Sequence, residues 1–178
     1  MAEDTKKINE IARKFGHLLI NSGTSMVRSA YDLKPKEYLG PVIQNTLKAI
    51  IGVDVSDADG KNYLVSWDTI EWIKDLDLTD KLIYYNEVFD CDDFAFHFSS
   101  LISTLYLLNN CGVAFGNLYD YNGKFIGRHA FNIIATDENG KLEFRIFEPM
   151  NDKWAKITGK RTDLGFGWIY EPSWVIFF

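Results

Sequence analysis

The chain has 178 residues, of which 47% are hydrophobic and 15% aromatic, and it carries a net charge of −6 with a pI near 5.0. This length supports one sizeable hydrophobic core, so we predict a single domain over residues 1–178. The acidic balance argues against sequence-independent binding to nucleic acid or anionic lipid, because both require an excess of Lys and Arg.

Composition also indicates a compartment. No run approaches the roughly 18 apolar residues that cross a bilayer, and the first twenty residues mix charged and apolar positions, unlike a signal peptide. Cys91 and Cys111 are the only cysteines, too few for a disulfide scaffold and suited to a reducing environment. We therefore expect a cytoplasmic protein without a nucleic-acid or membrane partner.

The first half of the chain predicts three helices. Apolar residues recur at steps of three and four from Thr5 to about Ile20, which is typical of an amphipathic helix. A second helix is expected between Pro41 and Gly52, and Ser66 can cap a short third one. The acidic segment 54–62 is predicted to form turns, and Lys81–Val88 to be extended.

A longer helix is predicted to begin at Cys91. Asp90 is a suitable N-cap, and Asp92 and Asp93 fall in the first turn, where carboxylates interact favourably with exposed N–H groups. The apolar positions that define its buried face are Phe94, Phe98, Leu101, Ile102, Leu105 and Leu108. After Gly112 the period changes to two, which predicts strands near 113–119, 127–136, 141–148, 168–170 and 174–178. One long helix therefore precedes an antiparallel sheet, and the fold class is α+β.

A hairpin turn at Asn139-Gly140 fixes a register between two of these strands, because both residues tolerate the positive φ of a type I′ turn. The predicted pairs are Glu138–Lys141, Ile133–Ile146, Phe131–Glu148 and His129–Met150. His129 and Glu148 then become diagonal neighbours on the apolar face, within reach of a hydrogen bond.

These residues suggest thiol chemistry. A helix N-terminus and a nearby imidazolium lower the pKa of a thiol from about 8.5 into the range of roughly 3.5–7.5. In the reaction that follows, Cys91 attacks a carbonyl, His129 takes and returns the proton, and Glu148 orients the imidazole. The candidate catalytic residues are thus Cys91, His129 and Glu148. We expect no cofactor and no metal, since no CxxC, HExxH or EF-hand spacing occurs.

The segments Cys91-Asp92-Asp93-Phe94-Ala95, Asn110-Cys111-Gly112-Val113, His129-Ala130-Phe131-Asn132 and Glu148-Pro149 resemble successive landmarks of the transglutaminase-like superfamily. The similarity covers residues 89–151. It implies a papain/transglutaminase-like core in which N-terminal helices precede a long central helix packed on an antiparallel sheet. It also implies a cysteine-dependent acyl-transfer enzyme, either an amide hydrolase (cysteine peptidase) or a transglutaminase-type transferase, that acts on a protein or peptide substrate with a Cys-His-Glu catalytic triad.

Other interpretations remain open. Asp90, Asp92 and Asp93 surround Cys91, and repulsion between carboxylates and a thiolate favours a noncatalytic binding or structural module instead. Asp93 and His97 lie four residues apart and allow a metal site. The aromatic residues are expected mainly to fill the core, yet their number leaves room for a carbohydrate-binding groove.

Overall fold

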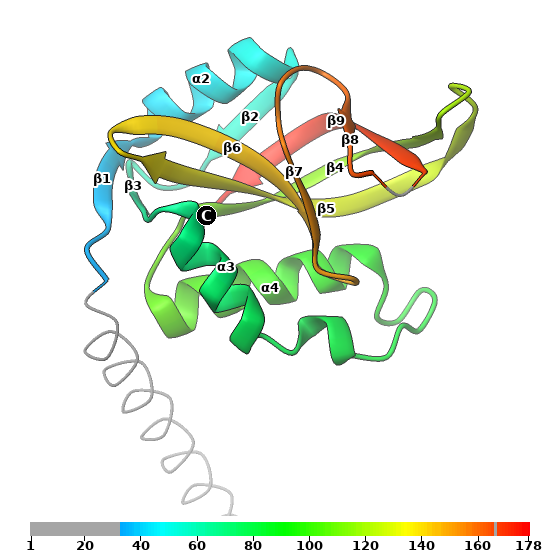
Figure 1. Ribbon diagram of the computed structural model, residues 1–178, viewed down its shortest axis with the longest axis horizontal. Coiled ribbons are helices and arrows are strands. Elements are labelled where there is room, and N and C mark those ends of the chain that lie inside the picture. Colours follow the sequence, from blue (N-terminus) through cyan, green and yellow to red (C-terminus); the bar gives the residue numbers. More distant parts are fainter. Residues whose placement is uncertain (1–32, 166) are drawn as a thin grey trace, which may run out of the picture.

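The computed structural model describes residues 33–178 except residue 166 (Figure 1). Its helices are α2 (Gly40–Ile51), α3 (Trp67–Leu76), the 3₁₀ helix η1 (Thr79–Lys81) and α4 (Cys91–Tyr106). Its strands are β1 (Lys36–Leu39), β2 (Asp54–Asp57), β3 (Lys61–Leu64), β4 (Cys111–Asp120), β5 (Phe125–Glu138), β6 (Lys141–Glu148), β7 (Lys153–Lys156), β8 (Thr162–Asp163) and β9 (Trp168–Phe177).

One twisted sheet dominates the molecule. Its strands follow the order β2-β9-β4-β5-β6-β7, with β8 paired to β9, while β1 and β3 form a separate two-stranded sheet. All pairs in the large sheet are antiparallel except β2 with β9, which run parallel. The strand β9 therefore lies inside the sheet, between one partner from the first third of the chain and one from the middle.

Helices cover both faces of this sheet, so that α2 lies above it and α3 and α4 lie below it (Figure 1). The upper core joins Ile43 and Leu47 of α2 to Phe131 and Ile133 of β5. The lower core joins Phe98 and other residues of α3 and α4 to the opposite face of the same strands. Two cores thus share one sheet.

Local signals explain where the helices begin and end. Pro41 occupies the first turn of α2, where its missing N–H costs nothing, and Gly52 ends the helix in the left-handed conformation. Asp90 and Asp93 form a capping box at the start of α4, and the Asp90 N–H donates to the Asp93 carboxylate at 3.1 Å. The predicted starts of these helices are confirmed.

The β5–β6 hairpin has the predicted register. Asn139 and Gly140 have φ values of 55° and 88°, as a type I′ turn requires. Ile133 pairs with Ile146, and Glu138 with Lys141. The side chains on the predicted apolar face consequently enter the upper core.

Several predicted elements differ from the structure. The segment 54–62 contributes strands β2 and β3 instead of turns alone, and Lys81–Val88 is largely irregular after η1 rather than extended. The two C-terminal strand candidates form one continuous strand, β9. The helix predicted over Thr5 to about Ile20 lies outside the described residues.

The predicted fold class, a papain/transglutaminase-like α+β core with a long central helix on an antiparallel sheet, is wrong. Of the described residues 43% are in strands and 28% in helices, so the protein is mostly β. The large sheet is mixed, because β2 joins it in parallel with β9. Sequence periodicity understated the strand content, since five of the strands are four residues long or shorter and carry too few positions to show alternation.

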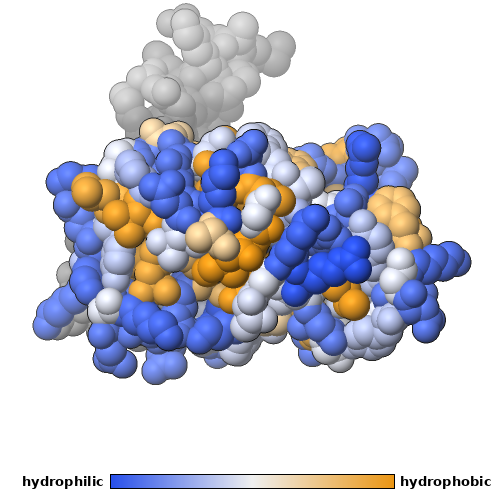
Figure 2. Space-filling model, turned by 90° about the horizontal axis from the view of Figure 1, so that it is seen from above, coloured by the Kyte–Doolittle hydropathy of each residue, from blue (hydrophilic) through white to orange (hydrophobic). Residues whose placement is uncertain are grey.

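The face that carries α2 and the β7–β8 connection is mainly hydrophilic, with hydrophobic side chains gathered in places between the polar ones (Figure 2). Among the described residues, no helix is both long enough and apolar enough to span a bilayer.

Candidate functional site

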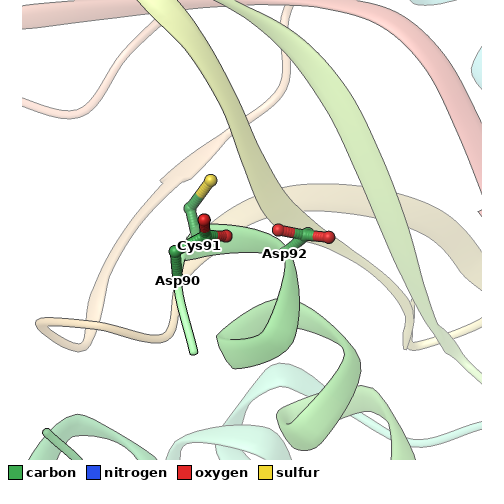
Figure 3. A group of neighbouring side chains, drawn as sticks. All are labelled: Asp90, Cys91 and Asp92. Atoms are coloured by element: carbon green, nitrogen blue, oxygen red, sulfur yellow. The ribbon is translucent and has the colours of Figure 1, made fainter. Parts of the chain in front are cut away.

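The first turn of α4 places a thiol at the start of a helix. Cys91 is the first residue of α4, directly after the N-cap residue Asp90, and its side chain projects away from the body of the helix (Figure 3). Cys91 is partly exposed, whereas Cys111 is buried, and neither forms a disulfide. Burial raises the pKa of the Cys111 thiol, so Cys111 stays protonated and serves as a packing residue.

Buried hydrogen bonds fix α4 against the sheet. The Asn132 amide of β5 donates to the carbonyl of Ala95 at 2.9 Å and to that of Gly112 at 3.2 Å. The Ser99 hydroxyl donates to the Cys111 carbonyl at 2.6 Å. These contacts tie the helix to β4 and β5, so the position of Cys91 relative to the strands is held by the protein interior.

His129 and Glu148 meet as their predicted register requires. The Nε2 atom of His129 lies 2.5 Å from Oε2 of Glu148, and the Tyr170 hydroxyl donates to the same oxygen at 2.6 Å. The other carboxylate oxygen accepts from the Met150 N–H at 3.3 Å. Glu148 is almost fully buried, so this carboxylate has its hydrogen-bond partners inside the protein and holds the imidazole in one orientation.

Cys91 and His129 interact through their side chains. Burial by itself lowers the pKa of His129, but its hydrogen bonds to Cys91 and Glu148, together with the charges of both groups, raise this pKa to about 9. The imidazole is therefore protonated at neutral pH. The Cys91 thiol thus lies next to an imidazolium at the start of a helix.

An open groove of about 610 Å³ lies over these residues. Side chains from α4, β4, β5 and β9 line it. The polar or titratable ones are Cys91, Asp92, Asn117, Arg128, His129 and Ser173. Phe115, Gly116 and Ala130 complete the lining. Phe89, which precedes α4, packs on Phe94 with ring centroids 4.8 Å apart and does not line the groove.

A compact group of possible metal ligands lies beside the groove. One ligand atom from each of Asp90, Cys91 and Asp92 lies within 4.8 Å of the others (Figure 3). Asp90 and Asp92 share a hydrogen bond between their carboxyl groups, which lowers the pKa of Asp90 and raises that of Asp92. Asp90 also accepts from the Glu87 N–H at 3.3 Å. The carboxylates are thus engaged with the helix start and with each other. Asp93 and His97, the pair that the sequence left open as an alternative metal site, do not belong to this group.

The structure brings the three predicted site residues together and places beside them groove residues that the sequence did not indicate. Cys91, His129 and Glu148, predicted from a helix start and a hairpin register, come together in the structure. Asn117, Arg128 and Ser173 were not predicted. Their proximity depends on the pairing of β4 with β5 and β9, whose register no local motif reveals.

No protein-family model and no curated protein matches this chain. Among the solved structures that resemble it are two that each show 23% identity over 79% of this chain. One is a PSL1a–E64 complex, with a TM-score of 0.56. The other is Polyporus squamosus lectin bound to the human-type influenza-binding epitope Neu5Aca2-6Galb1-4GlcNAc, with a TM-score of 0.55. The chain shares its fold with these proteins. It spans about half of their length, 51% and 49%.

These similarities correct the family assignment. The structural similarity is to a lectin and not to the transglutaminase-like superfamily. The predicted membership of that superfamily is therefore wrong. The predicted cysteine-dependent acyl-transfer enzyme, with its peptidase and catalytic-triad description, is overturned with it. Nothing in the similarities supports the expected protein or peptide substrate. The alternative reading, a binding module, agrees better with them.

Proposed function

We propose that this protein is a binding module that takes a glycan into the groove between the start of α4 and strands β4, β5 and β9. The observation that carries the proposal is the lining of that groove. Short polar and charged side chains from four elements converge on one open space of about 610 Å³, beside a partly exposed aromatic ring. A polyhydroxylated ligand requires this combination of hydrogen-bonding groups and apolar surface.

The chemistry of Arg128 favours an acidic sugar. Arg128 is exposed at the groove, and among the described residues no hydrogen bond or ion pair engages its guanidinium. A free guanidinium can hold a carboxylate through two parallel hydrogen bonds. The epitope named for the Polyporus squamosus lectin contains a sialic acid, which supplies such a carboxylate. A sialylated glycan is therefore the first ligand to test.

Titration calorimetry with Neu5Aca2-6Galb1-4GlcNAc and with Galb1-4GlcNAc tests the proposal. We expect saturable binding, with the sialylated ligand preferred. Arg128→Ala should weaken binding of the sialylated ligand roughly ten- to hundredfold, because a charge-assisted hydrogen bond contributes about 1.5–3 kcal/mol. Its effect on the unsialylated ligand should be small.

Lys124→Ala is the matched control, since it removes one positive charge from the neighbouring β4–β5 turn, outside the groove. It should leave both affinities unchanged. If neither these two ligands nor a wider glycan panel shows saturable binding to the wild type, the glycan-binding proposal is wrong.

We also propose a second role for the same groove, in which the Cys91 thiol reacts with an electrophilic ligand such as an epoxide. An S–C bond forms, one C–O bond of the epoxide ring breaks, and the released oxygen takes up the proton of the thiol. The specific observation is the chain of contacts from Cys91 to His129 and from His129 to Glu148. PSL1a, whose fold this chain shares, is described in complex with E64, which supplies a probe.

Intact-protein mass spectrometry after incubation with E64 measures this capture. We expect one E64 adduct that survives denaturation, is absent in Cys91→Ser and is retained in Cys111→Ser. An adduct that is absent from the wild type, or that forms equally on both cysteines, would exclude a selectively reactive Cys91. Because the readout is covalent mass, it is independent of the glycan measurement.

A further inference from the structure

A row of four aromatic rings continues from the wall of the groove onto the surface. Phe115 of β4, which lines the groove, stacks on Trp174 of β9 with centroids 5.5 Å apart and planes 16° apart. Phe96 of α4 contacts Phe115 at 6.3 Å and stacks on Phe178 at 5.9 Å, with planes 13° apart. We call Phe96, Phe115, Trp174 and Phe178 the aromatic row.

A hydrogen bond between β9 and β4 and packing against the core hold the aromatic row in place. The Ser173 hydroxyl donates to the Phe115 carbonyl at 2.9 Å, which links β9 to β4 at the point where their register shifts. Phe115 and Phe178 are half-buried and pack with the small cluster that contains Ala95 and Val113. The rings therefore form a preorganised surface, which costs little entropy when a ligand covers it.

Two of these rings remain open to solvent, since Phe96 and Trp174 are each 41% exposed. A large aromatic side chain has a surface of about 150–250 Å² that it can bury. Because less than half of the Phe96 and Trp174 surfaces is exposed, the open apolar area of the row is well below the roughly 800 Å² that each partner buries in a stable protein interface. A small ligand with one flat apolar face suits the row better than a second folded protein does.

We propose that the aromatic row is a ring-stacking subsite that binds the C–H face of a pyranose unit next to the unit held in the groove. This inference rests on the proposed glycan binding and extends it to an oligosaccharide. A pyranose has one face of C–H groups and a rim of hydroxyls. The row would cover the C–H face, while Asn117 and Ser173 lie close enough to Phe115 and Trp174 to meet the hydroxyls. Trp174 becomes the principal specificity-determining residue outside the groove.

Binding of Galb1-4GlcNAc and of the trisaccharide to Trp174→Ala and Phe96→Ala tests the subsite. We expect Trp174→Ala to weaken trisaccharide binding roughly tenfold, the upper range for one aromatic contact, and Phe96→Ala to weaken it less. Trp174→Phe should restore most of the affinity, because a flat ring is retained. The quenching of indole fluorescence on binding should disappear in Trp174→Ala.

Trp168→Ala is the matched control. Trp168 lies on the same strand and is similarly exposed at 39%, but it is outside both the groove and the row. Its replacement should leave the affinity unchanged. If the wild type binds the trisaccharide and Trp174→Ala binds it equally well, the subsite is excluded while glycan binding stands. If the wild type binds no glycan, the proposed function itself fails.

Sedimentation velocity tests whether the row instead mediates self-association. A wild-type dimer that dissociates in Trp174→Ala would assign the row to self-association and overturn the subsite.

Discussion

At the level of single residues, the contacts of His129 with Cys91 and Glu148 determine how the site responds to pH. The pKa of His129 is raised from an ordinary 6.5 to about 9. A group whose pKa is higher in the folded than in the unfolded state contributes stability that is complete below the unfolded value and is lost as the pH rises through the folded value. The stabilising effect of protonated His129 should therefore decline between about pH 6.5 and pH 9.

Glu148→Gln tests this pH dependence. NMR titration of the His129 ring should give a midpoint near 9 in the wild type and a lower value in the variant, because the amide no longer stabilises the imidazolium while Cys91 still does. The variant should also lose stability on the order of 2–3 kcal/mol at pH 6, and less at pH 9.5, as measured by urea unfolding. Glu143→Gln, on the same strand but remote from His129, is the control. A wild-type midpoint near 6.5 would contradict the raised pKa.

The same residues show what a sequence can and cannot reveal of a site. The contact between His129 and Glu148 was predictable because the Asn139-Gly140 turn sets the register locally and both residues follow from it by counting. Arg128 and Ser173 are separated by more than forty residues, and they line one groove only because β4 pairs on both sides. No short pattern encodes that pairing.

At the level of elements, strands β4 and β9 approach each other unusually closely at Gly116. A Cβ atom at Gly116 would lie 2.4 Å from the Glu171 carbonyl oxygen and 3.0 Å from the Cα of Pro172. Both are backbone atoms, which cannot move aside without shifting β9. The ladder also shifts its register at this point.

Gly116→Ala should therefore destabilise the protein by about 1–3 kcal/mol, the usual cost of overpacking a tight interior site. Gly127→Ala is the matched control on β5, where no atom lies within 4 Å of the added Cβ. It should change stability by much less. Chemical denaturation measures the free energy of unfolding of both variants. Equal values would show that the β9 backbone can shift at this point at little cost.

Elements with strong local signals were predicted, and those without them were not. The capping residues and a long apolar stripe predicted helix α4, and the turn residues predicted the β5–β6 hairpin. Strands β1, β2, β3 and β7 are four residues each, and their partners lie far away in sequence or beyond an irregular loop. Their existence depends on tertiary pairing, which propensity does not encode.

At the level of the whole molecule, the central strand β5 joins the two cores. Ile133 is fully buried in the upper core and its neighbour Ile134 is fully buried in the lower core. Successive side chains on a strand point to opposite faces, so the sheet couples the two layers of helices mechanically.

Ile133→Ala and Ile134→Ala should each cost about 2–5 kcal/mol, the usual range for truncating a buried isoleucine. Because the cores share one sheet, both variants should still unfold in a single transition that has the same midpoint by tryptophan fluorescence and by far-UV circular dichroism. Two separated transitions in either variant would show that the upper and lower layers unfold independently.

The position of β9 between β2 and β4 also bears on how the molecule is made. On the ribosome, residues 54–57 and 111–120 emerge well before residues 168–177, the strand that joins them. Until then the nascent chain presents the unpaired edge of a ten-residue strand, β4, to its surroundings. Assembly of the sheet must therefore wait until residues 168–177 have emerged, and chaperones that shield open strand edges would matter most during that interval.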